Sequence, residues 1–385
     1  MNYLNKKKLF LVVLLTALLS SFLTVMGLLK LFGLGEENTG DLLRFFGVKR
    51  MIETRFVNEV DSTSLIDGAI NGMVQSLGDP HSMYMKSSMY KSLKEHTAGA
   101  FGGIGVTMGF KDDKVTIVSV LEGTPGERAG LKVGDEILAV DGVPVSEYQS
   151  EEVALHIRGD AGTTVKLLIH REGSEDSEYS LERDTIKVPS VKGKILAGTK
   201  MGYIRIASFG ENTGEEFKAE YKNLEEAGMQ GLILDLRQNP GGLITSCVEV
   251  ADMLVPQGNI VSVVQRDGSR EDYDSSLEEQ KYPLVVLIDG NSASASEILA
   301  GALQDKEAAT LVGTKSYGKG SVQVVVPLFH EDGLKLTIAK YYTPNGRCID
   351  GIGIEPDITV NLDEDSQEDS QLIKAKEILQ GKIAN

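Results

Sequence analysis

The pattern of apolar and polar positions divides the chain into an apolar N-terminal segment, two amphipathic helices and a long alternation of strands and helices. The segment from Leu9 to Leu29 carries no charge and follows Lys6, Lys7 and Lys8. It is long enough to cross a hydrocarbon core of about 30 Å, and basic residues stay on the inner side of a membrane. The pattern therefore predicts an uncleaved anchor with the rest of the chain exported. A cleaved signal peptide, which has a shorter apolar region and a small-residue cleavage site, is the alternative.

Between residues 41 and 83, apolar residues recur at helical spacing and predict two amphipathic helices. The second helix has Asp61 or Ser62 as its N-cap and Gly78 beyond its end. A turn of sequence Gly-Asp-Pro-His-Ser follows. Its His81 could act as a catalytic base, but a histidine after proline in a turn more often makes a local hydrogen bond.

A glycine-rich turn opens the next region, and short strands with two helices follow as far as residue 183. Backbone N–H groups without bulky side chains beside them can receive a peptide carboxylate, and a following edge strand can pair with the peptide backbone. The residues concerned are Gly102, Gly103, Ile104, Gly105 and Val106. Their spacing is not GxGxxG and no strand–helix–strand unit follows, so a dinucleotide site is not expected.

From residue 184 onward strands and helices alternate, which predicts an α/β core. The runs Gly231–Leu236 and Leu284–Asp289 are almost continuously apolar, as strands buried on both faces are. Each run leads into a loop rich in glycine or serine and then into a helical pattern. We expect the same sheet to continue through Ala309–Gly313 and Ser321–Leu328.

Candidate chemistry lies in the stretch Gly290–Gln323. A serine between a strand and a helix lies beside unpaired backbone N–H groups that can hold an oxyanion, although an ordinary helix start with serine caps has the same pattern. The spacing Gly313-x-x-x-x-Gly318-Lys319 is the beginning of a P-loop. That interpretation fails because Gly320 stands where a P-loop needs Ser or Thr, and because a β-branched run follows instead of a helix.

Charge and cysteine content exclude several classes of function. The net charge of the 385 residues is −17, which leaves no basic patch to neutralise the phosphates of a nucleic acid. Cys247 and Cys348 are the two cysteines, and no CxxC or Cys/His cluster occurs, so neither a metal nor a cofactor is expected. We expect both cysteines to be free.

The two halves of Gly290–Gln323 together resemble the active-site region of the C-terminal processing peptidases. These are serine proteases that carry a PDZ domain and use a Ser–Lys dyad. The matching motifs are Ser292–Glu297, with the sequence Ser-Ala-Ser-Ala-Ser-Glu, and Gly318-Lys319-Gly320-x-x-Gln323. The resemblance extends from about residue 65 to residue 357, and residues 101–183 resemble a PDZ domain.

The resemblance implies a role for several residues. They are the nucleophile Ser294, the base Lys319 and the supporting Gln323. The chemistry also requires donors to an oxyanion, and the backbone N–H groups of Ala295 and of Gly241 or Gly242 are the candidates. A serine hydroxyl needs an adjacent base, and lysine can serve only when it is neutral. Its pKa of about 10.4 must then fall by several units, which burial can achieve. A glutamine orients the amine without adding charge, whereas a carboxylate would raise the pKa.

Three alternatives remain open at this point. A Ser–His–Asp mechanism would use one of five histidines, none of which has an accompanying motif: His81, His96, His156, His170 and His330. A catalytically silent PDZ adaptor would be expected to have lost Ser294, Lys319 or Gln323, and all three are present. A crotonase-type acyl-CoA enzyme would find no acyl-CoA outside the cytoplasm.

We therefore expect a multidomain α/β protein. Its expected parts are a cytoplasmic tail (1–8), a transmembrane anchor (9–29), a helical segment (36–95), a PDZ domain (96–184), a crotonase- or ClpP-like peptidase core (185–362), and an acidic linker with a last helix (363–385). That helix would pack on the N-terminal helices or on a partner subunit, and a homodimer is left open. The expected function is a single-pass membrane serine endopeptidase with its catalytic side outside the cytoplasm. It would bind apolar C-termini of protein substrates through the PDZ domain and cleave through an acyl-enzyme.

Overall fold

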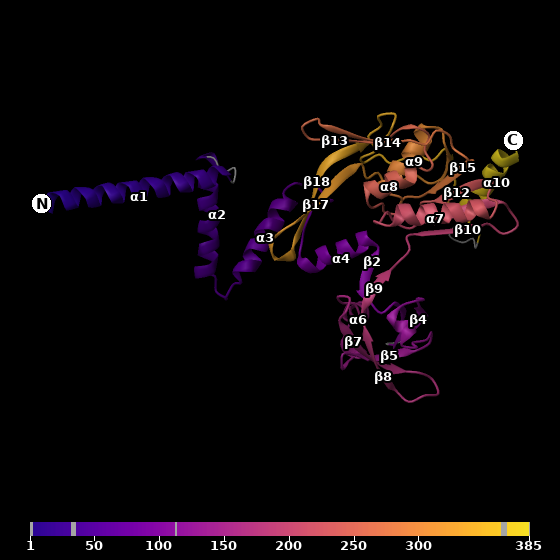
Figure 1. The fold of residues 1–385 in the computed structure, drawn as a ribbon, viewed down its shortest axis with the longest axis horizontal. Helices are drawn as coiled ribbons and strands as arrows, with labels where there is room; N and C mark the ends of the chain where they lie inside the picture. The colour runs from indigo at the N-terminus through magenta and orange to yellow at the C-terminus, as the bar shows by residue number, and fades with distance from the viewer. Residues whose placement is uncertain (1–2, 32–35, 112–113, 363–367, 385) are drawn as a thin grey trace. The chain divides into compact units, whose positions relative to one another are not determined.

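The computed structural model describes residues 3–31, 36–111, 114–362 and 368–384. The chain divides into two compact units, Met1–Gly78 and Asp79–Asn385 (Figure 1). The side chains of residues 1–7, 25–26 and 28–39 lie outside the description, as do residues 363–367. Parts of the predicted tail, anchor and acidic linker fall on these positions.

The first unit consists of helices, which are α1 (Tyr3–Leu31), α2 (Glu36–Arg55) and α3 (Ser62–Gln75). Asp61 is the N-cap of α3, and its carboxylate accepts a hydrogen bond of 2.8 Å from the N–H of Ser64. Gly78, beyond the end of this helix, has a φ of 64°, which glycine adopts without strain. The predicted N-cap of the second helix is therefore confirmed.

The predicted anchor at Leu9–Leu29 lies within α1. Among the helices that the structure describes, none combines the length and the apolar character that crossing a membrane requires.

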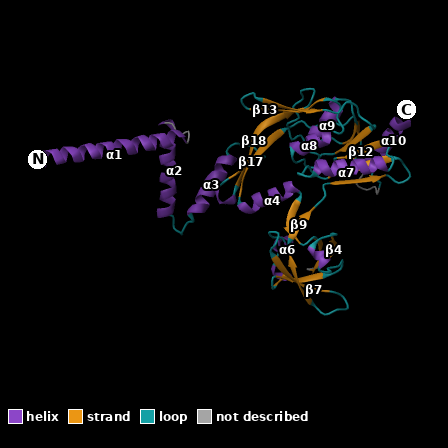
Figure 2. Ribbon diagram, in the orientation of Figure 1, coloured by secondary structure: helices purple, strands orange, loops and turns teal. Residues whose placement is uncertain are grey.

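The second unit begins with β1 (Met83–Met85) and α4 (Ser87–Ala98) and continues into a small β-domain. Figure 2 shows this domain as strands joined by loops, with α6 among them. Its sheet has the order β3-β4-β5-β7-β8, with β6 paired to β5, and β2 pairs with β9 in a separate ribbon. The elements are β2 (Ala100–Gly103), β3 (Val106–Lys111), β4 (Lys114–Val120), α5 (Pro125–Arg128), β5 (Glu136–Val140), β6 (Val143–Pro144), α6 (Ser150–Ile157), β7 (Thr164–His170), β8 (Ser177–Glu182) and β9 (Asp184–Lys187).

The rest of the unit is an α/β core around a six-stranded sheet of order β10-β11-β12-β15-β16-β19. The strands from β11 onward are parallel, and β10 is antiparallel to β11. The elements are β10 (Val191–Ile195), β11 (Met201–Ile206), α7 (Thr213–Glu226), β12 (Gly231–Asp235), α8 (Ile244–Ala251), β15 (Leu284–Ile288), α9 (Ala295–Asp305), β16 (Thr310–Gly313), β19 (Ile358–Thr359) and α10 (Ser370–Ala384).

Helices cover both faces of this sheet. On one face, Leu232, Leu234 and Val286 pack in one cluster with apolar residues of α7, α8 and α9. On the other face, Ile233 and Val285 pack against α10, in agreement with strands buried on both sides. The last helix was expected on the N-terminal helices or on a partner subunit. It packs on the core sheet instead, because its apolar side chains match the second face of β12 and β15.

A second sheet packs against α8 and α9. Apolar residues of its strands β13 and β18 belong to the same hydrophobic cluster as residues of these two helices. Its order is β1-β18-β13-β14, and β17 also pairs with β18. The strands are β13 (Gly258–Gln265), β14 (Arg270–Ser275), β17 (Ser321–Pro327) and β18 (Gly333–Tyr342). The prediction that Ser321–Leu328 continues the first sheet is wrong. The chain turns after Gly320, and β17 forms an antiparallel pair with β18.

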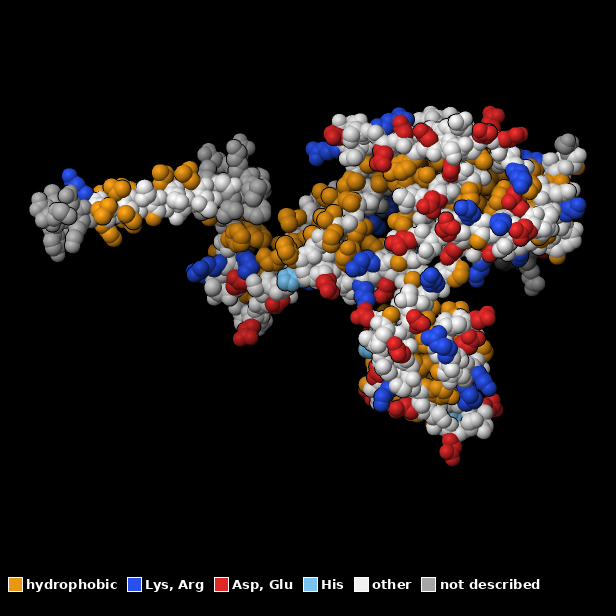
Figure 3. Space-filling model, viewed as in Figure 1, with side chains coloured by type: hydrophobic (Ala, Val, Ile, Leu, Met, Phe, Trp, Pro, Cys, Tyr) orange, Lys and Arg blue, Asp and Glu red, His pale blue; other side chains and the backbone are white. Residues whose placement is uncertain are grey.

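Three adjacent parallel strands carry the functional loops. β12, β15 and β16 are neighbours in the sheet, and each is followed at its carboxyl end by one of the motifs found in the sequence. Ligands of open α/β sheets bind at this edge. On the face of the core seen in Figure 3, the Lys and Arg side chains (blue) are interspersed with Asp and Glu side chains (red).

Candidate active site

Ser294 lies in the turn that joins β15 to α9. It is the N-cap of α9, and its φ of 54° is a left-handed value that side-chain-bearing residues rarely adopt. Such strain costs about 1–3 kcal/mol and persists only where the surroundings fix it. Here the N–H of Ala293 donates to the carbonyl of Asn239 at 3.0 Å, which ties the turn to the neighbouring loop. The turn places the half-buried Ser294 side chain at the start of a helix.

The other two serines of the run are buried and bonded. The Ser292 hydroxyl donates to the carbonyl of Leu236 at 2.8 Å and accepts from the N–H of Asp289. The Ser296 hydroxyl donates to the carbonyl of Asn239 at 3.0 Å. Both side chains join the β15–α9 turn to the loop after β12. Of the three serines, Ser294 is therefore the accessible one.

Lys319 lies in the turn between β16 and β17 and is half-buried. Burial, helped by the positive charge of Lys335, lowers the pKa of Lys319 below its ordinary value. The negative charges of Glu297 and Asp79 act in the opposite direction but do not cancel the effect. A lower pKa increases the neutral fraction, which is the form that accepts a proton.

The buried carboxylate of Glu297 joins the two turns. Its Oε2 accepts hydrogen bonds from the backbone N–H groups of Ser294, at 2.8 Å, and Lys319, at 2.9 Å. Its Oε1 accepts from the N–H of Gly318, at 2.7 Å, and from the Ser316 hydroxyl, at 2.5 Å. One side chain thus holds the backbones of the predicted nucleophile and the predicted base beside each other.

Tyr341 makes a second bridge between the same residues. Its hydroxyl lies within hydrogen-bond distance of the carbonyl of Ser294, at 3.1 Å, and of the carbonyl of Lys319. The side chain is buried in β18, and burial raises the pKa of Tyr341 well above its ordinary value, so the hydroxyl keeps its proton. Glu297 and Tyr341 therefore hold the amide and carbonyl groups of both residues.

Gln323 lies on β17 and is half-buried. Its amide nitrogen donates to the hydroxyls of Ser321, at 2.9 Å, and Thr337, at 3.1 Å. Within the described part of the chain, no hydrogen bond joins Lys319 to Gln323 or to the Ser294 hydroxyl. Catalytic hydrogen bonds in ligand-free enzymes are often long and form only in the complex with substrate.

Of the predicted oxyanion donors, Gly241 lies beside Ala295 at the start of α9, whereas Gly242 lies against the backbone of Phe209. A Cβ added to Gly241 would lie 2.8 Å from the Cβ of Ser294 and 2.9 Å from the nitrogen of Ala295, so this glycine allows a close approach. The N–H of Gly241 already donates to the side chain of Asn239 at 2.8 Å. Gly242 N–H has no partner among the described residues, and Ala295 is the first helical residue, whose N–H has no acceptor within the helix. Of the two glycines, Gly242 has the available amide.

Of the predicted peptide-binding residues, Ile104 and Gly105 form the turn between β2 and β3, and Val106 begins β3. Gly102 and Gly103 lie on β2, where they pair with Thr185 and Asp184 of β9. β3 is at the edge of its sheet, so its outer backbone groups can pair with an added strand. Ile104 is buried in one cluster with Val153 and Ile157 of α6, and Val106 packs against that cluster. The carbonyls of Ile104 and Gly105 accept N–H groups from elsewhere in the domain, which fixes the shape of the turn.

Comparisons with known proteins cover each of these regions. The model of peptidase family S41 matches residues 200–360, that of the PDZ domain matches residues 102–181, and that of the activating protease CtpB N-terminal domain matches residues 35–89. A carboxy-terminal-processing protease of Bartonella bacilliformis is 41% identical over 334 residues, which cover 84% of this chain and 76% of that protein.

The chain belongs to peptidase family S41. The peptidase is similar also to the carboxy-terminal processing protease CtpA of Bacillus subtilis, with 37% identity over 92% of this chain and 77% of the relative. The solved structure of a photosystem II D1 C-terminal processing protease aligns with a TM-score of 0.51 at 29% identity, covering 90% of this chain and 99% of that one. The S41 peptidase is thus a serine protease of the C-terminal processing type that carries a PDZ domain.

Sequence reasoning missed the roles of Glu297 and Tyr341 in the peptidase. Glu297 stands three residues after Ser294, which is the spacing of a capping box, and that signal could have identified it. Tyr341 gives no such signal, because it meets Ser294 only through the pairing of distant strands. Two further features have no role assigned by the resemblance. They are Asn239, whose side chain accepts from the N–H of Gly241, and the turn that contains Asp79.

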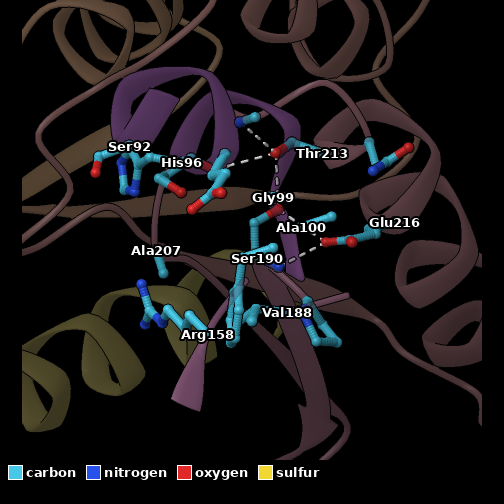
Figure 4. Close-up of a pocket in the computed structure, with 16 residues that line it drawn as sticks. Ser92, His96, Gly99, Ala100, Arg158, Val188, Ser190, Ala207, Thr213 and Glu216 are labelled. Carbon is cyan, nitrogen blue, oxygen red and sulfur yellow. Dashed lines mark hydrogen bonds between the residues drawn. The ribbon is translucent and has the colours of Figure 1, made fainter. Parts of the chain in front are cut away.

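A separate cavity of about 280 Å³ lies among α4, the β2–β9 ribbon and α7 of the peptidase. Figure 4 shows Ser190 beside Thr213 and Glu216, joined to them by hydrogen bonds. The Ser190 hydroxyl lies 2.7 Å from that of Thr213, and the Ser190 N–H donates to Glu216 at 2.7 Å. The guanidinium of Arg158, which also lines the cavity, lies 4.2 Å from the centre of the Phe101 ring. None of the predicted catalytic residues lines this cavity.

Proposed function

We propose that the peptidase cleaves protein substrates through an acyl-enzyme on Ser294, with Lys319 as the general base. The neutral amine of Lys319 accepts the proton of the Ser294 hydroxyl as the oxygen attacks the substrate carbonyl carbon. The tetrahedral intermediate then collapses, and the amine leaving group takes the proton from Lys319. A water molecule, activated by the same amine, hydrolyses the ester and restores Ser294.

The N–H groups of Ala295 and Gly242 would stabilise the oxyanion of the tetrahedral intermediate. Ala295 adds the favourable N-terminal end of α9, and Gly241 leaves room for the carbonyl beside Ser294. Removal of one oxyanion donor typically raises the barrier by about 2.7–4 kcal/mol. Gln323 would orient the Lys319 amine without adding a charge.

One observation carries the proposal: the N–H groups of Ser294 and Lys319 share the Oε2 atom of Glu297. The direct test is to incubate the protein with an unfolded protein substrate and to compare wild type with Ser294→Ala and Lys319→Ala. Both variants should fold and leave the substrate intact. Normal cleavage by either variant would refute the dyad.

The presence of a PDZ domain in a C-terminal processing protease implies that the substrates are recognised at their C-termini. Our finer proposal is that the turn Gly102–Val106 receives the terminal carboxylate, with an apolar last side chain beside Ile104 and Val106. The edge position of β3 supports it, because a substrate strand could extend the sheet there.

Location and assembly rest on the sequence alone. We propose that the catalytic part lies outside the cytoplasm, because Lys6–Lys8 precede the uncharged segment 9–29. The domain limits at 36–95, 96–184 and 185–362, the likeness of the core to crotonase or ClpP folds, and a homodimer are further proposals. N-terminal sequencing of the mature protein, together with cell fractionation, tests the location.

A further inference from the structure

The turn from Asp79 to Ser82 is bound to β18 next to Gln323. The N–H of Thr337 donates to the Ser82 hydroxyl at 3.0 Å, and that hydroxyl donates to Asp79 Oδ2 at 2.5 Å. The N–H of His81 donates to Asp79 Oδ1 at 3.1 Å. A turn that precedes the PDZ domain in the chain is therefore connected to β18, at the residue that pairs with Gln323 of β17.

The same Thr337 fixes the amide of Gln323. The Gln323 amide nitrogen has two hydrogens, and its two acceptors are the hydroxyls of Ser321 and Thr337. With both hydrogens used, the carbonyl oxygen of Gln323 is the group left to accept a hydrogen bond. An acceptor is what a lysine amine requires, since the amine of a base must donate its hydrogens while its lone pair faces the serine.

Asp79 holds Thr337 in place through Ser82. Burial opposes ionisation of Asp79, but hydrogen bonds, above all the one from Ser82, outweigh it and lower the pKa of Asp79 to about 2. An ionised carboxylate can only accept, so the Ser82 hydroxyl gives its single hydrogen to Asp79, and its oxygen accepts from the Thr337 N–H. The hydroxyl oxygen of Thr337 in turn accepts from the Gln323 nitrogen at 3.1 Å.

We propose that Asp79 and Thr337 are positioning residues of the peptidase, which fix the orientation of the Gln323 amide so that its oxygen serves Lys319. The inference rests on the proposed role of Lys319 as the base. It extends the active site to the Gly-Asp-Pro-His-Ser turn, which neither the serine motif nor the lysine motif contains. Neither residue touches the reacting atoms, so each acts through Gln323.

Charges around Lys319 provide a second readout beside kcat and KM. The charged groups that act on it are Lys335 of β18, Glu297 of α9 and Asp79 of the turn, while the hydroxyl of Tyr341 meets its carbonyl. Asp79 raises the pKa of Lys319 and Lys335 lowers it. Removal of the Asp79 charge must therefore move the ionisation of Lys319 to lower pH, and removal of the Lys335 charge must move it to higher pH.

The test measures kcat, KM and the pH profile of kcat/KM for the full chain acting on an unfolded protein. Thr337→Val removes the hydroxyl and should lower kcat on the order of 10- to 100-fold with little change in KM, because a misplaced catalytic group costs this much. Thr337→Ser keeps the hydroxyl and should retain most activity. Asp79→Asn should lower kcat in the same way and shift the rising limb to lower pH, whereas Lys335→Gln should shift it to higher pH.

Each outcome has one meaning. If Lys319→Ala is inactive while folded Thr337→Val and Asp79→Asn keep the wild-type kcat and limb, the positioning role is refuted and the dyad stands. If Lys319→Ala remains active, the proposed base is wrong. Thermal unfolding of each variant is the control for folding. If Thr337→Val fails to fold, Asp79→Asn tests the proposal instead. The proposal then requires both a lower kcat and a shift of the rising limb of the kcat/KM profile to lower pH.

Discussion

The backbone N–H groups of Ser294 and Lys319 donate to the same oxygen, Oε2 of the buried Glu297. The two residues are 25 positions apart in the sequence and follow different strands, so this carboxylate is what brings their turns into register. The Tyr341 hydroxyl repeats the connection at their carbonyls. The relative placement of nucleophile and base is therefore a property of two buried side chains that do not take part in the reaction.

Replacement of Glu297 by glutamine should separate the two turns. A glutamine amide presents N–H groups where the carboxylate accepted them, and each unsatisfied donor costs about 1–3 kcal/mol. We expect Glu297→Gln to unfold at lower urea concentration and to lose at least about 100-fold in kcat. The exposed Glu226→Gln on α7, whose side chain is 68% exposed, is the matched control and should change neither quantity. Full activity of a folded Glu297→Gln would show that the shared acceptor is unimportant.

The three serines of the run 292–296 are predicted to have different roles, one in catalysis and two in structure. Ser294→Ala should abolish proteolysis, whereas Ser292→Ala and Ser296→Ala should keep a large part of it. The latter two lose buried hydrogen bonds and should be destabilised by about 1–3 kcal/mol each. Proteolysis rates and urea unfolding curves of the three variants provide the measurement. An equal loss of activity in all three would mean that the nucleophile lies elsewhere.

The close approach of Gly241 to the serine predicts a severe effect of one methyl group. A Cβ there would lie 2.6 Å from the carbonyl oxygen of Ala293 and 2.8 Å from the Cβ of Ser294. We expect Gly241→Ala to lower kcat by orders of magnitude. Gly198→Ala is the control, since Gly198 also has a positive φ, of 73°, but nothing lies within 4 Å of the added atom. It carries the same kind of backbone strain and should reduce stability without reducing kcat. Similar activities of the two variants would contradict the account.

The edge strand β3 predicts selection of substrates by their C-termini. Replacement of an apolar C-terminal residue by Asp, or amidation of the terminal carboxylate, should slow cleavage markedly. The carboxylate would lose its proposed partner N–H groups in Gly102–Val106, or an acidic side chain would have to lie against the apolar Val106. Cleavage rates of three versions of one substrate measure the effect. Equal rates for all three would assign the PDZ domain another role.

Much of the core follows from the sequence. The runs Gly231–Asp235 and Leu284–Ile288 are apolar throughout because helices cover both faces of their sheet, so they were recognisable as strands. The β-branched run at β17 was recognisable in the same way, but its partner was not. Nothing in such a run states which sheet it joins, and its antiparallel pairing with β18 depends on the turn between them.

The same distinction, between local sequence patterns and strand pairing, applies to the residues of the site. The accessible Ser294 and the half-buried Lys319 lie in motifs with fixed spacing, so their neighbourhood could be predicted. Tyr341 and Thr337 could not, because both reach the site through the register of β17 on β18, which local sequence does not encode. Gly241 and Gly242 were predicted as alternative donors, and the local sequence does not show that the N–H of Gly241 is already bonded to Asn239.

The ionisation of Lys319 is the most direct test of the dyad. Burial and Lys335 lower its pKa, and only the neutral amine can act as the base, so kcat/KM should rise with pH through a single ionisation. We predict that this ionisation lies below the roughly 10.4 of free lysine and above the roughly 6.5 of histidine. Substitution of the five histidines one at a time should leave it in place.

Lys319→Arg completes the measurement, because a guanidinium keeps its proton at any workable pH. The pH profile of kcat/KM should be recorded for wild type and for this variant on the same unfolded substrate. The account predicts a rising limb for wild type and no detectable turnover for Lys319→Arg at any pH. A Lys319→Arg enzyme with near-normal turnover and an unchanged limb would contradict it.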